Sequence, residues 1–308
     1  MDKREVDRRV AHAKKVVAPA FEGAGDRKFL GIIPGTGWGD GLKEGGFEPL
    51  HEFGYDKMKI PGADSRVAGH SKSMRVGLLH GRPVVVMGRV HPNEANNPDL
   101  VYAMRIVIES IRERLEGLII TNGVGTLHGP INEHLGAIQS RIHTAVINYL
   151  AYIHSGRKSE PIGIGDVSVT DSFDTLCVGK DTPLFSGEFV DPYHNGYHRD
   201  NDRYLGLGRD AVRYVQGRAP LAKFSYIHGP QFEGPGEKIA ARARGCDVIG
   251  MSGLEGLVAK NVPFTHLTLA TNGAFAPHSH KGNLDVGEQK AKITAAILEV
   301  LMNMWPRS

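Results

Sequence analysis

The chain has 308 residues, of which 41% are hydrophobic and 23% are charged, so it is long and apolar enough to bury a sizeable core and is not a disordered, charge-dominated chain. Lys plus Arg (37) nearly balances Asp plus Glu (34), and the net charge of +3 argues against a nucleic-acid binder that neutralises phosphates along a basic stripe. Two cysteines, Cys177 and Cys246, provide no disulfide framework, and no run approaches the ~20 apolar residues of a membrane span. The charged N-terminus lacks a signal peptide's apolar stretch, so a cytoplasmic location with no membrane partner is expected.

Short apolar runs alternate with helical patterns along the chain. Strands are predicted at 29–33, 83–87, 118–121, 162–169, 222–227, 247–250 and 264–270. Helical apolar stripes occupy 104–115, with Gly117 as the expected C-terminal stop, and then 132–155 and 293–301. The stretch 172–203 has no periodicity, and a long irregular stretch of this kind usually has a function or is mobile.

This alternation predicts the fold class. Continuous apolar strands are typical of a sheet covered on both faces, so we expect an α/β fold with a central mixed, mostly parallel twisted sheet flanked by helices. No shift in composition marks a boundary, which predicts a single domain over 1–308. The segment at about 130–161 is expected to be a helical insertion.

Six motifs that could bind a ligand follow these strands. The first motif is Gly35-Thr36-Gly37, whose glycines let the backbone approach an anion closely. Met87-Gly88-Arg89-Val90-His91 supplies a guanidinium fork and an imidazole, both suited to phosphate oxygens. The others are Thr121-Asn122-Gly123, Gly229-Pro230-Gln231-Phe232-Glu233, Gly250-Met251-Ser252 and Thr271-Asn272-Gly273. Because open α/β sheets bind ligands at strand ends, these motifs together predict one site.

In this order, and with Val67-Ala68-Gly69-His70, the motifs resemble the trimeric class of purine nucleoside phosphorylases, a family that also includes methylthioadenosine phosphorylase. The resemblance runs from about 29 to 300. It implies a nucleoside phosphorylase-like fold and a pentosyltransferase, in which inorganic phosphate attacks C1′ of a purine nucleoside and releases the base and a sugar 1-phosphate. It also implies no metal or organic cofactor, and a homotrimer whose active sites lie at subunit interfaces.

The resemblance also implies roles for individual residues. The phosphate would be surrounded by Thr36, His70, Arg89, His91, the Gly123 amide and Ser252. The nucleoside would be bound by Phe232, Glu233, Met251, Asn272 and, from a neighbouring subunit, Phe189. Asn272, Glu233 and His91 are the predicted catalytic residues, with Asn272 donating to N7 of the leaving purine.

Glu233 and Asn272 favour 6-oxopurines such as inosine and guanosine, because Glu233 can accept the N1–H. Methylthioadenosine enzymes usually carry Ser and Asp at these two positions. The sequence departs from the family at Asn93, where a ribose-contacting Tyr is common, and at Gly256, which replaces a Glu. The family's histidine for the sugar 5′ position has only nearby candidates in His278, His280 and Asn283. Activity on a 6-aminopurine or a 5′-modified nucleoside is therefore the alternative.

Three functions from other classes are the alternatives. A nicotinamide-dependent oxidoreductase would need G-x-G-x-x-G, but Asp40 occupies the third glycine position. A metal hydrolase could use His194, His198 and Asp200, or His278 and His280, but no H-E-x-x-H pattern occurs. A non-catalytic nucleoside- or phosphate-binding protein on the same fold stays open, because fold alone does not decide function.

Overall fold

A computed structural model describes the chain over residues 1–64, 71–91, 98–131, 137–156, 160–174, 201–227, 229, 232–259, 262–276 and 279–306. Within these residues the strands are β1 (Phe29–Ile33), β2 (Glu48–Gly54), β3 (Ser73–Leu79), β4 (Arg82–Met87), β5 (Leu115–Thr126), β6 (Val167–Asp174), β7 (Leu221–Tyr226), β8 (Val248–Gly250) and β9 (Phe264–Gly273). The helices are α1 (Lys3–Val17), α2 (Trp38–Glu44), α3 (Ala103–Ile111), α4 (Ala137–Ser155), α5 (Asn201–Gln216), α6 (Pro235–Ala243), α7 (Glu255–Val258), α8 (His280–Gln289) and α9 (Ala291–Met304). Short 3-10 turns lie at Ala18–Phe21, Pro98–Tyr102 and Arg112–Arg114.

The strands of the described residues form one nine-stranded sheet in the order β2-β3-β4-β1-β5-β8-β7-β6-β9. An additional pairing joins β9 to β5, so β5, β8, β7, β6 and β9 close into a ring. Five strand pairings are parallel, and four are antiparallel. The predicted mixed α/β sheet flanked by helices is therefore confirmed, with parallel pairing only just in the majority.

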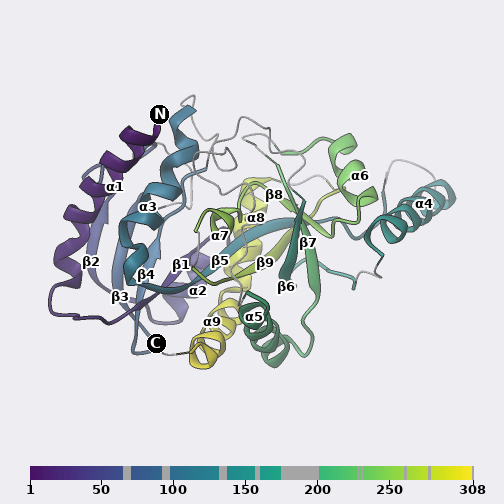
Figure 1. The fold of residues 1–308 in the computed structure, drawn as a ribbon. Coiled ribbons are helices and arrows are strands. Elements are labelled where there is room, and N and C mark those ends of the chain that lie inside the picture. The colour runs from purple at the N-terminus through teal and green to yellow at the C-terminus, as the bar shows by residue number, and fades with distance from the viewer. Residues whose placement is uncertain are drawn as a thin grey trace.

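Helices cover both faces of the sheet (Figure 1). Alternate side chains of β4 belong to different hydrophobic cores, because successive side chains of a strand point to opposite faces of the sheet. Val85 and Met87 join the core that includes residues of α1 and α3, whereas Val84 and Val86 join the core that includes residues of α2, α5 and α9. The continuous apolar runs of the sequence thus have hydrophobic partners on both sides, and each fully buried side chain contributes about 1.5–3 kcal/mol.

The helix predicted over 104–115 ends earlier than the sequence indicated. α3 stops at Ile111, a 3-10 turn follows, and Leu115 already belongs to β5. Gly117 therefore lies inside a strand, and its prediction as a helix stop is wrong. A Cβ at Gly117 would collide with the ring of Trp305, so the packing of Trp305 on β5 explains this glycine.

The strand predicted over 162–169 starts at Val167 and continues to Asp174. The preceding residues form a turn in which Gly165 has a φ of +87° and the Asp166 carboxylate accepts from the Gly163 amide at 2.7 Å. The strands β2 and β3 were not predicted: β2 is largely exposed and lacks a buried apolar run, and Arg75 and Gly77 interrupt the apolar run of the largely buried β3. Most of the irregular stretch at 172–203 lies outside the described residues, between β6 and α5.

α4 stands apart from the two helical layers. It projects beyond the β7 and β6 side of the sheet and lies beside α6 (Figure 1). It falls within the segment predicted to be a helical insertion. The division of the chain into domains stays a prediction. No helix in the described parts combines the length and apolar character that crossing a bilayer requires.

Candidate active site

The site is built along the second half of β5. The sequence predicted a strand that ends at Thr121, but β5 continues through Asn122 and Gly123 to Thr126. Gly35, after β1, lies directly against them. A Cβ there would be 2.5 Å from the Asn122 Cα and 2.7 Å from Nη1 of Arg89, so only glycine permits this approach. The turn that carries Thr36 is therefore held against β5 and Arg89.

Gly123 and Thr36 meet at the next position along β5. A Cβ on Gly123 would be 3.1 Å from Cβ of Thr36 and 3.1 Å from Cγ2 of Thr271. Thr271 in turn hydrogen-bonds the neighbouring Asn272, with 3.3 Å between the hydroxyl and Oδ1. Because β9 pairs with β5, with Gly125 opposite Asn272, β5 connects the first and the last predicted motif.

Arg89 is buried and makes a direct ion pair with Glu255. Its Nε donates to Glu255 Oε1 at 2.5 Å, and its Nη1 donates to the Thr121 carbonyl at 2.9 Å. Burial alone would raise the pKa of Glu255, but the guanidinium holds it below its ordinary value. Nη2 of Arg89 is buried and has no hydrogen-bond partner in the described part of the chain.

His91 is buried beside the loop that follows β8. Burial, reinforced by the charges of Arg89 and Lys72, lowers the pKa of its imidazole to about 3 and outweighs a hydrogen bond with the Met251 backbone. His91 is thus neutral at pH 7. It lines a small cavity together with Met251, Ser252 and Glu255. Arg89 and His91 therefore both reach the 251–255 segment.

A chain of hydrogen bonds holds the Ser252 backbone in place. Asn122 Nδ2 donates to the Ser252 carbonyl at 3.3 Å, and Asn122 Oδ1 lies 2.7 Å from Nε2 of His266. The ring of His266 stacks on Phe173, with centroids 5.4 Å apart, and meets the edge of Phe224. Burial lowers the pKa of His266 to about 3, although the Glu255 charge acts in the opposite direction.

The residues predicted to hold the base lie on neighbouring connections. Glu233 precedes α6, is buried, and forms no hydrogen bond or ion pair with any residue the structure describes. Phe232 is 40% exposed, which leaves its ring accessible to a ligand. Gly229, in the same connection, approaches the Met251 sulfur so closely that a Cβ would be 2.5 Å away.

Asn272 is buried at the end of β9. Its Nδ2 has no hydrogen-bond partner among the described residues. Buried polar groups are nearly always hydrogen-bonded, and an unsatisfied one costs about 1–3 kcal/mol. Arg89 and Asn272 therefore each hold an unused donor, and both were predicted from sequence to bind the substrate.

Several predicted residues lie outside the described residues. They are His70, Phe189, Asn93, His278 and the His194, His198 and Asp200 set of the hydrolase alternative. Of the candidates for the sugar 5′ position, His280 and Asn283 lie in the first turn of α8. Within the described residues, no cluster of three or more His, Cys, Asp or Glu side chains could hold a metal ion.

Sequence reasoning included Asn122 in a motif without giving it a role, and it missed Glu255, His266 and Lys72 as members of this site. Glu255 is one residue from Gly256, which replaces a glutamate of the resembling family, so that a carboxylate is present in the adjacent position. His266 is the one ionisable residue within the apolar 264–270 run, and this was the available signal. Lys72 donates to the Arg89 carbonyl at 3.1 Å, and no motif indicated it.

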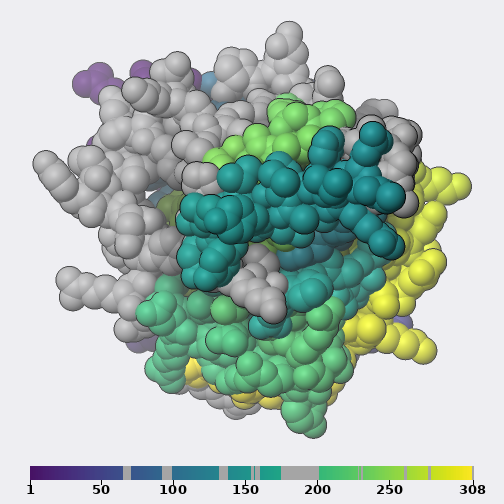
Figure 2. Space-filling model, turned by 90° about the vertical axis from the view of Figure 1, so that its right-hand side faces the viewer, coloured from purple at the N-terminus to yellow at the C-terminus, as the bar shows by residue number. Residues whose placement is uncertain are grey.

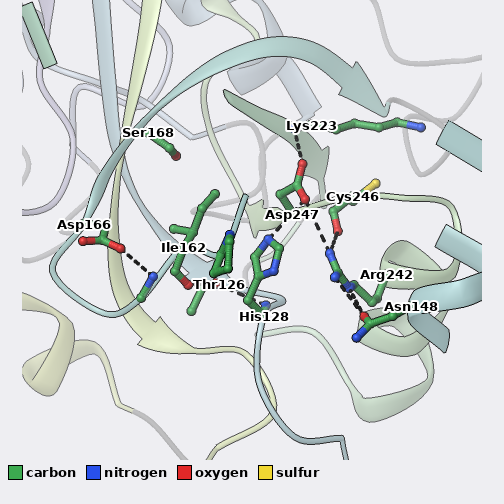
Figure 3. Close-up of polar contacts among 12 residues, drawn as sticks. Thr126, His128, Asn148, Ile162, Asp166, Ser168, Lys223, Arg242, Cys246 and Asp247 are labelled. Carbon is green, nitrogen blue, oxygen red and sulfur yellow. Dashed lines mark hydrogen bonds and ion pairs between the residues drawn. The ribbon is translucent and has the colours of Figure 1, made fainter. Parts of the chain in front are cut away.

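A second polar cluster surrounds Asp247 (Figure 3). Its carboxylate accepts from the Lys223 amide at 2.9 Å, and it contacts His128 at 3.1 Å and Arg242 at 3.4 Å. Next to it, burial raises the pKa of Cys246 to about 12, and the thiol donates to Asp174. These groups satisfy one another, and Cys246 is a buried free thiol whose raised pKa makes it unreactive.

No family model and no curated protein matches this sequence. Solved structures of similar fold do exist. One is isoform 2 of purine nucleoside phosphorylase from Schistosoma mansoni with cytosine and ribose-1-phosphate, at 20% identity and a TM-score of 0.66 over 96% of this chain and 97% of that one. Others are the schistosome enzyme with hypoxanthine (21%, TM-score 0.63, 96% and 97%) and the Schistosoma mansoni enzyme with adenosine (22%, TM-score 0.64, 96% and 98%). The predicted nucleoside phosphorylase-like fold is thereby confirmed.

Proposed function

We propose that this protein is a purine nucleoside phosphorylase, a pentosyltransferase of purine salvage. The observation that carries the proposal is the set of contacts along β5. They join Thr36, Gly123, Arg89, Ser252 and Asn272, and leave buried donors of Arg89 and Asn272 without partners. A ligand that supplies oxygen and nitrogen acceptors would satisfy both.

The phosphate half of the site combines hydrogen-bond donors with little net charge. Arg89 is offset by Glu255 at 2.5 Å, and the neutral His91 has a single ring N–H. A phosphate dianion would therefore be held mainly by donors: Arg89 Nη2, the hydroxyls of Thr36 and Ser252, the Gly123 amide, and the His91 N–H when it turns from the Met251 backbone to the anion. Lys72 adds a further positive charge beside Arg89 and His91. His70 completes the predicted set.

The base half places a carboxylate and an amide at the purine edge. Glu233 would accept the N1–H of a 6-oxopurine, and Asn272 would donate to N7 and tolerate the 6-oxo group. Phe232 and Met251 would pack on the base and the ribose. This pairing favours inosine and guanosine over adenine nucleosides.

In the reaction, a phosphate oxygen forms a bond to C1′ while the bond from C1′ to N9 breaks, and the electron pair goes to the purine. Positive charge develops on the sugar and negative charge on the base. Phosphate beneath C1′ stabilises the sugar, and Asn272 stabilises the base through N7. Removing one such donor costs about 2.7–4 kcal/mol of transition-state stabilisation. Holding both reactants in line lowers the barrier further.

The proposal includes an assembly and a setting. Phe189 of a neighbouring subunit would close the ribose site in a homotrimer. No metal or organic cofactor would take part, inorganic phosphate being a co-substrate, and the enzyme would act in the cytoplasm.

The deciding experiment is a panel of inosine, guanosine, adenosine and methylthioadenosine, each with and without phosphate, with release of free base measured. Phosphate-dependent release, fastest with the first two, is expected. Preference for an adenine nucleoside would select the methylthioadenosine phosphorylase-type alternative. Binding of nucleoside without release would identify the non-catalytic alternative.

A further inference from the structure

In α4, the face turned away from the rest of the protein carries most of the large apolar side chains. Apart from the half-buried Ile147, its inner face carries small and polar residues: Ser140 donates to the Ile131 carbonyl at 2.9 Å, Thr144 accepts from the Ile131 amide at 3.1 Å, and Ala151 is buried. Most of its large apolar side chains point to water instead. Seven of them are 37–74% exposed, namely Ile138, Ile142, Val146, Tyr149, Leu150, Tyr152 and Ile153, here called the α4 stripe.

The orientation of α4 is fixed by specific contacts. Asn148 accepts from Nε of Arg242 on α6 at 3.0 Å and from Nη2 at 2.8 Å, and Arg242 is itself paired with Asp247 (Figure 3). Turning the stripe inward would break these partly buried hydrogen bonds; a hydrogen bond to a charged group is worth about 1.5–3 kcal/mol when buried and less with partial exposure. Figure 2 shows α4 lying across the surface of the molecule.

The stripe has the spacing of a helix–helix seam. Ile142, Val146, Tyr149 and Ile153 follow one another at intervals of 4, 3 and 4, which brings apolar side chains to one line along the helix. Arg141 is the single Lys, Arg, Asp or Glu within the sequence 137–155. Two copies of this helix would therefore meet with little charge repulsion, whereas helices that bind membrane surfaces are rich in Lys and Arg.

The exposed area fits a stable pair. At about 150–250 Å² for a large side chain, the stripe offers on the order of 700 Å² of surface, more than the largest apolar patch of a typical monomer. Two such faces together would bury on the order of 1,400 Å², within the range of about 1,200–2,000 Å² of stable interfaces.

We propose that the α4 stripe is a homotypic interface, which packs against the same stripe of a second copy about a twofold axis. Such an interface is isologous, because each copy presents the same surface. It is independent of the phosphorolysis proposed above. Combined with the trimer that the sequence predicts, it would join two trimers into a hexamer.

The first test is the solution mass by light scattering at micromolar concentration. We expect an even number of subunits for the wild type, and half that number for Ile142→Glu/Tyr149→Glu. Tyr214→Glu, on the exposed face of α5, is the matched control and should leave the mass unchanged. An odd-numbered wild-type assembly, a monomer, or an unchanged mass in the double variant would overturn the proposal.

The second test remains decisive if the double variant fails to fold. Val146→Cys lies in the middle of the stripe, and a short bis-maleimide should crosslink it to its own copy, whereas Tyr214→Cys should give no dimer. Failure of Val146→Cys to crosslink in the folded protein would refute the pairing. Wild-type binding to phosphatidylcholine vesicles that the double variant loses at unchanged mass would assign the stripe to a lipid surface and also overturn it.

Discussion

Nε2 of His266 lies 2.7 Å from Oδ1 of Asn122, and the direction of this hydrogen bond is determined by its neighbours. The Ser252 carbonyl can only accept, so the amide nitrogen of Asn122 must face it and the amide oxygen must face His266. His266 therefore donates from Nε2. With a pKa of about 3 it is neutral at pH 7, and its buried Nδ1 has no partner in the described part of the chain. His266 thus positions Ser252 through Asn122.

We expect His266→Leu to lower the free energy of unfolding by about 1–3 kcal/mol, because it leaves the buried Asn122 oxygen unsatisfied. If His266 positions Ser252, the KM for phosphate should rise several-fold more than the KM for inosine. His266→Gln can donate from its amide to the same oxygen, so it should recover much of the phosphate KM. Urea denaturation and steady-state kinetics with each substrate varied in turn measure these effects. Equal changes in both KM values, with no recovery by glutamine, would reduce His266 to a packing role.

Stability should fall on acidification through the two buried histidines, His91 and His266. The pKa of each is lowered from 6.5 to about 3 in the folded state, so between these values the unfolded chain binds more protons. Their stabilisation is complete above pH 6.5 and is lost as the pH falls towards 3, at up to about 1.4 kcal/mol per pH unit for each histidine. His266→Gln should reduce the slope of unfolding free energy against pH by about this amount between pH 5 and 4. Identical slopes for wild type and variant would contradict it.

The fold was largely predictable because its strands are read from local sequence. A strand with helices on both faces, such as β4, needs an unbroken apolar run, and such runs are visible without knowledge of the partners. β2 was missed because its side chains are mostly exposed. The end of α3 was misplaced because Gly117 accommodates Trp305, a residue 188 positions away by its numbering, and no local pattern records that contact.

For the candidate site, the sequence indicated which motifs to group, and the roles of the individual residues stay predictions. Motifs that follow strands could be grouped, since strand ends meet at one edge of a sheet. The ion pair between Arg89 and Glu255 joins residues 166 positions apart, and no residue near Arg89 in the sequence indicates it. The environment of His266, between two phenylalanine rings, likewise depends on strands far apart in sequence.

Glu255→Gln should release the Arg89 guanidinium for phosphate. Removing one partner of a buried ion pair destabilises a protein by about 3–5 kcal/mol, because the other charge is left uncompensated. Inorganic phosphate would then offset that charge, so the rise in Tm on adding phosphate should be larger for Glu255→Gln than for the wild type. Thermal unfolding with and without phosphate at about 100 times its Kd, where binding adds about 2.7 kcal/mol of stability, measures this.

The pair Arg82–Glu116 provides a matched control for this experiment. It is similarly buried, with an N–O distance of 2.5 Å, and it lies at the start of β4 and β5. Glu116→Gln should destabilise comparably while the response to phosphate stays at the wild-type level. If Glu255→Gln instead abolishes the phosphate response, Glu255 orients Arg89 for the anion and does not compete with it.

Asn272→Asp tests the base site most directly. A carboxylate accepts where the amide donates, so the variant should lose kcat/KM for inosine by about 10²–10³-fold, as expected for a lost transition-state donor. In its protonated form the new carboxyl can also serve N7 beside a 6-amino group, so the ratio of adenosine to inosine turnover should rise. Asn303→Asp makes the same chemical change on the exposed side of α9 and should alter neither value. The substitution removes the unpartnered Nδ2 donor. An unchanged adenosine-to-inosine ratio in Asn272→Asp would therefore show that Asn272 does not determine which purine base is bound.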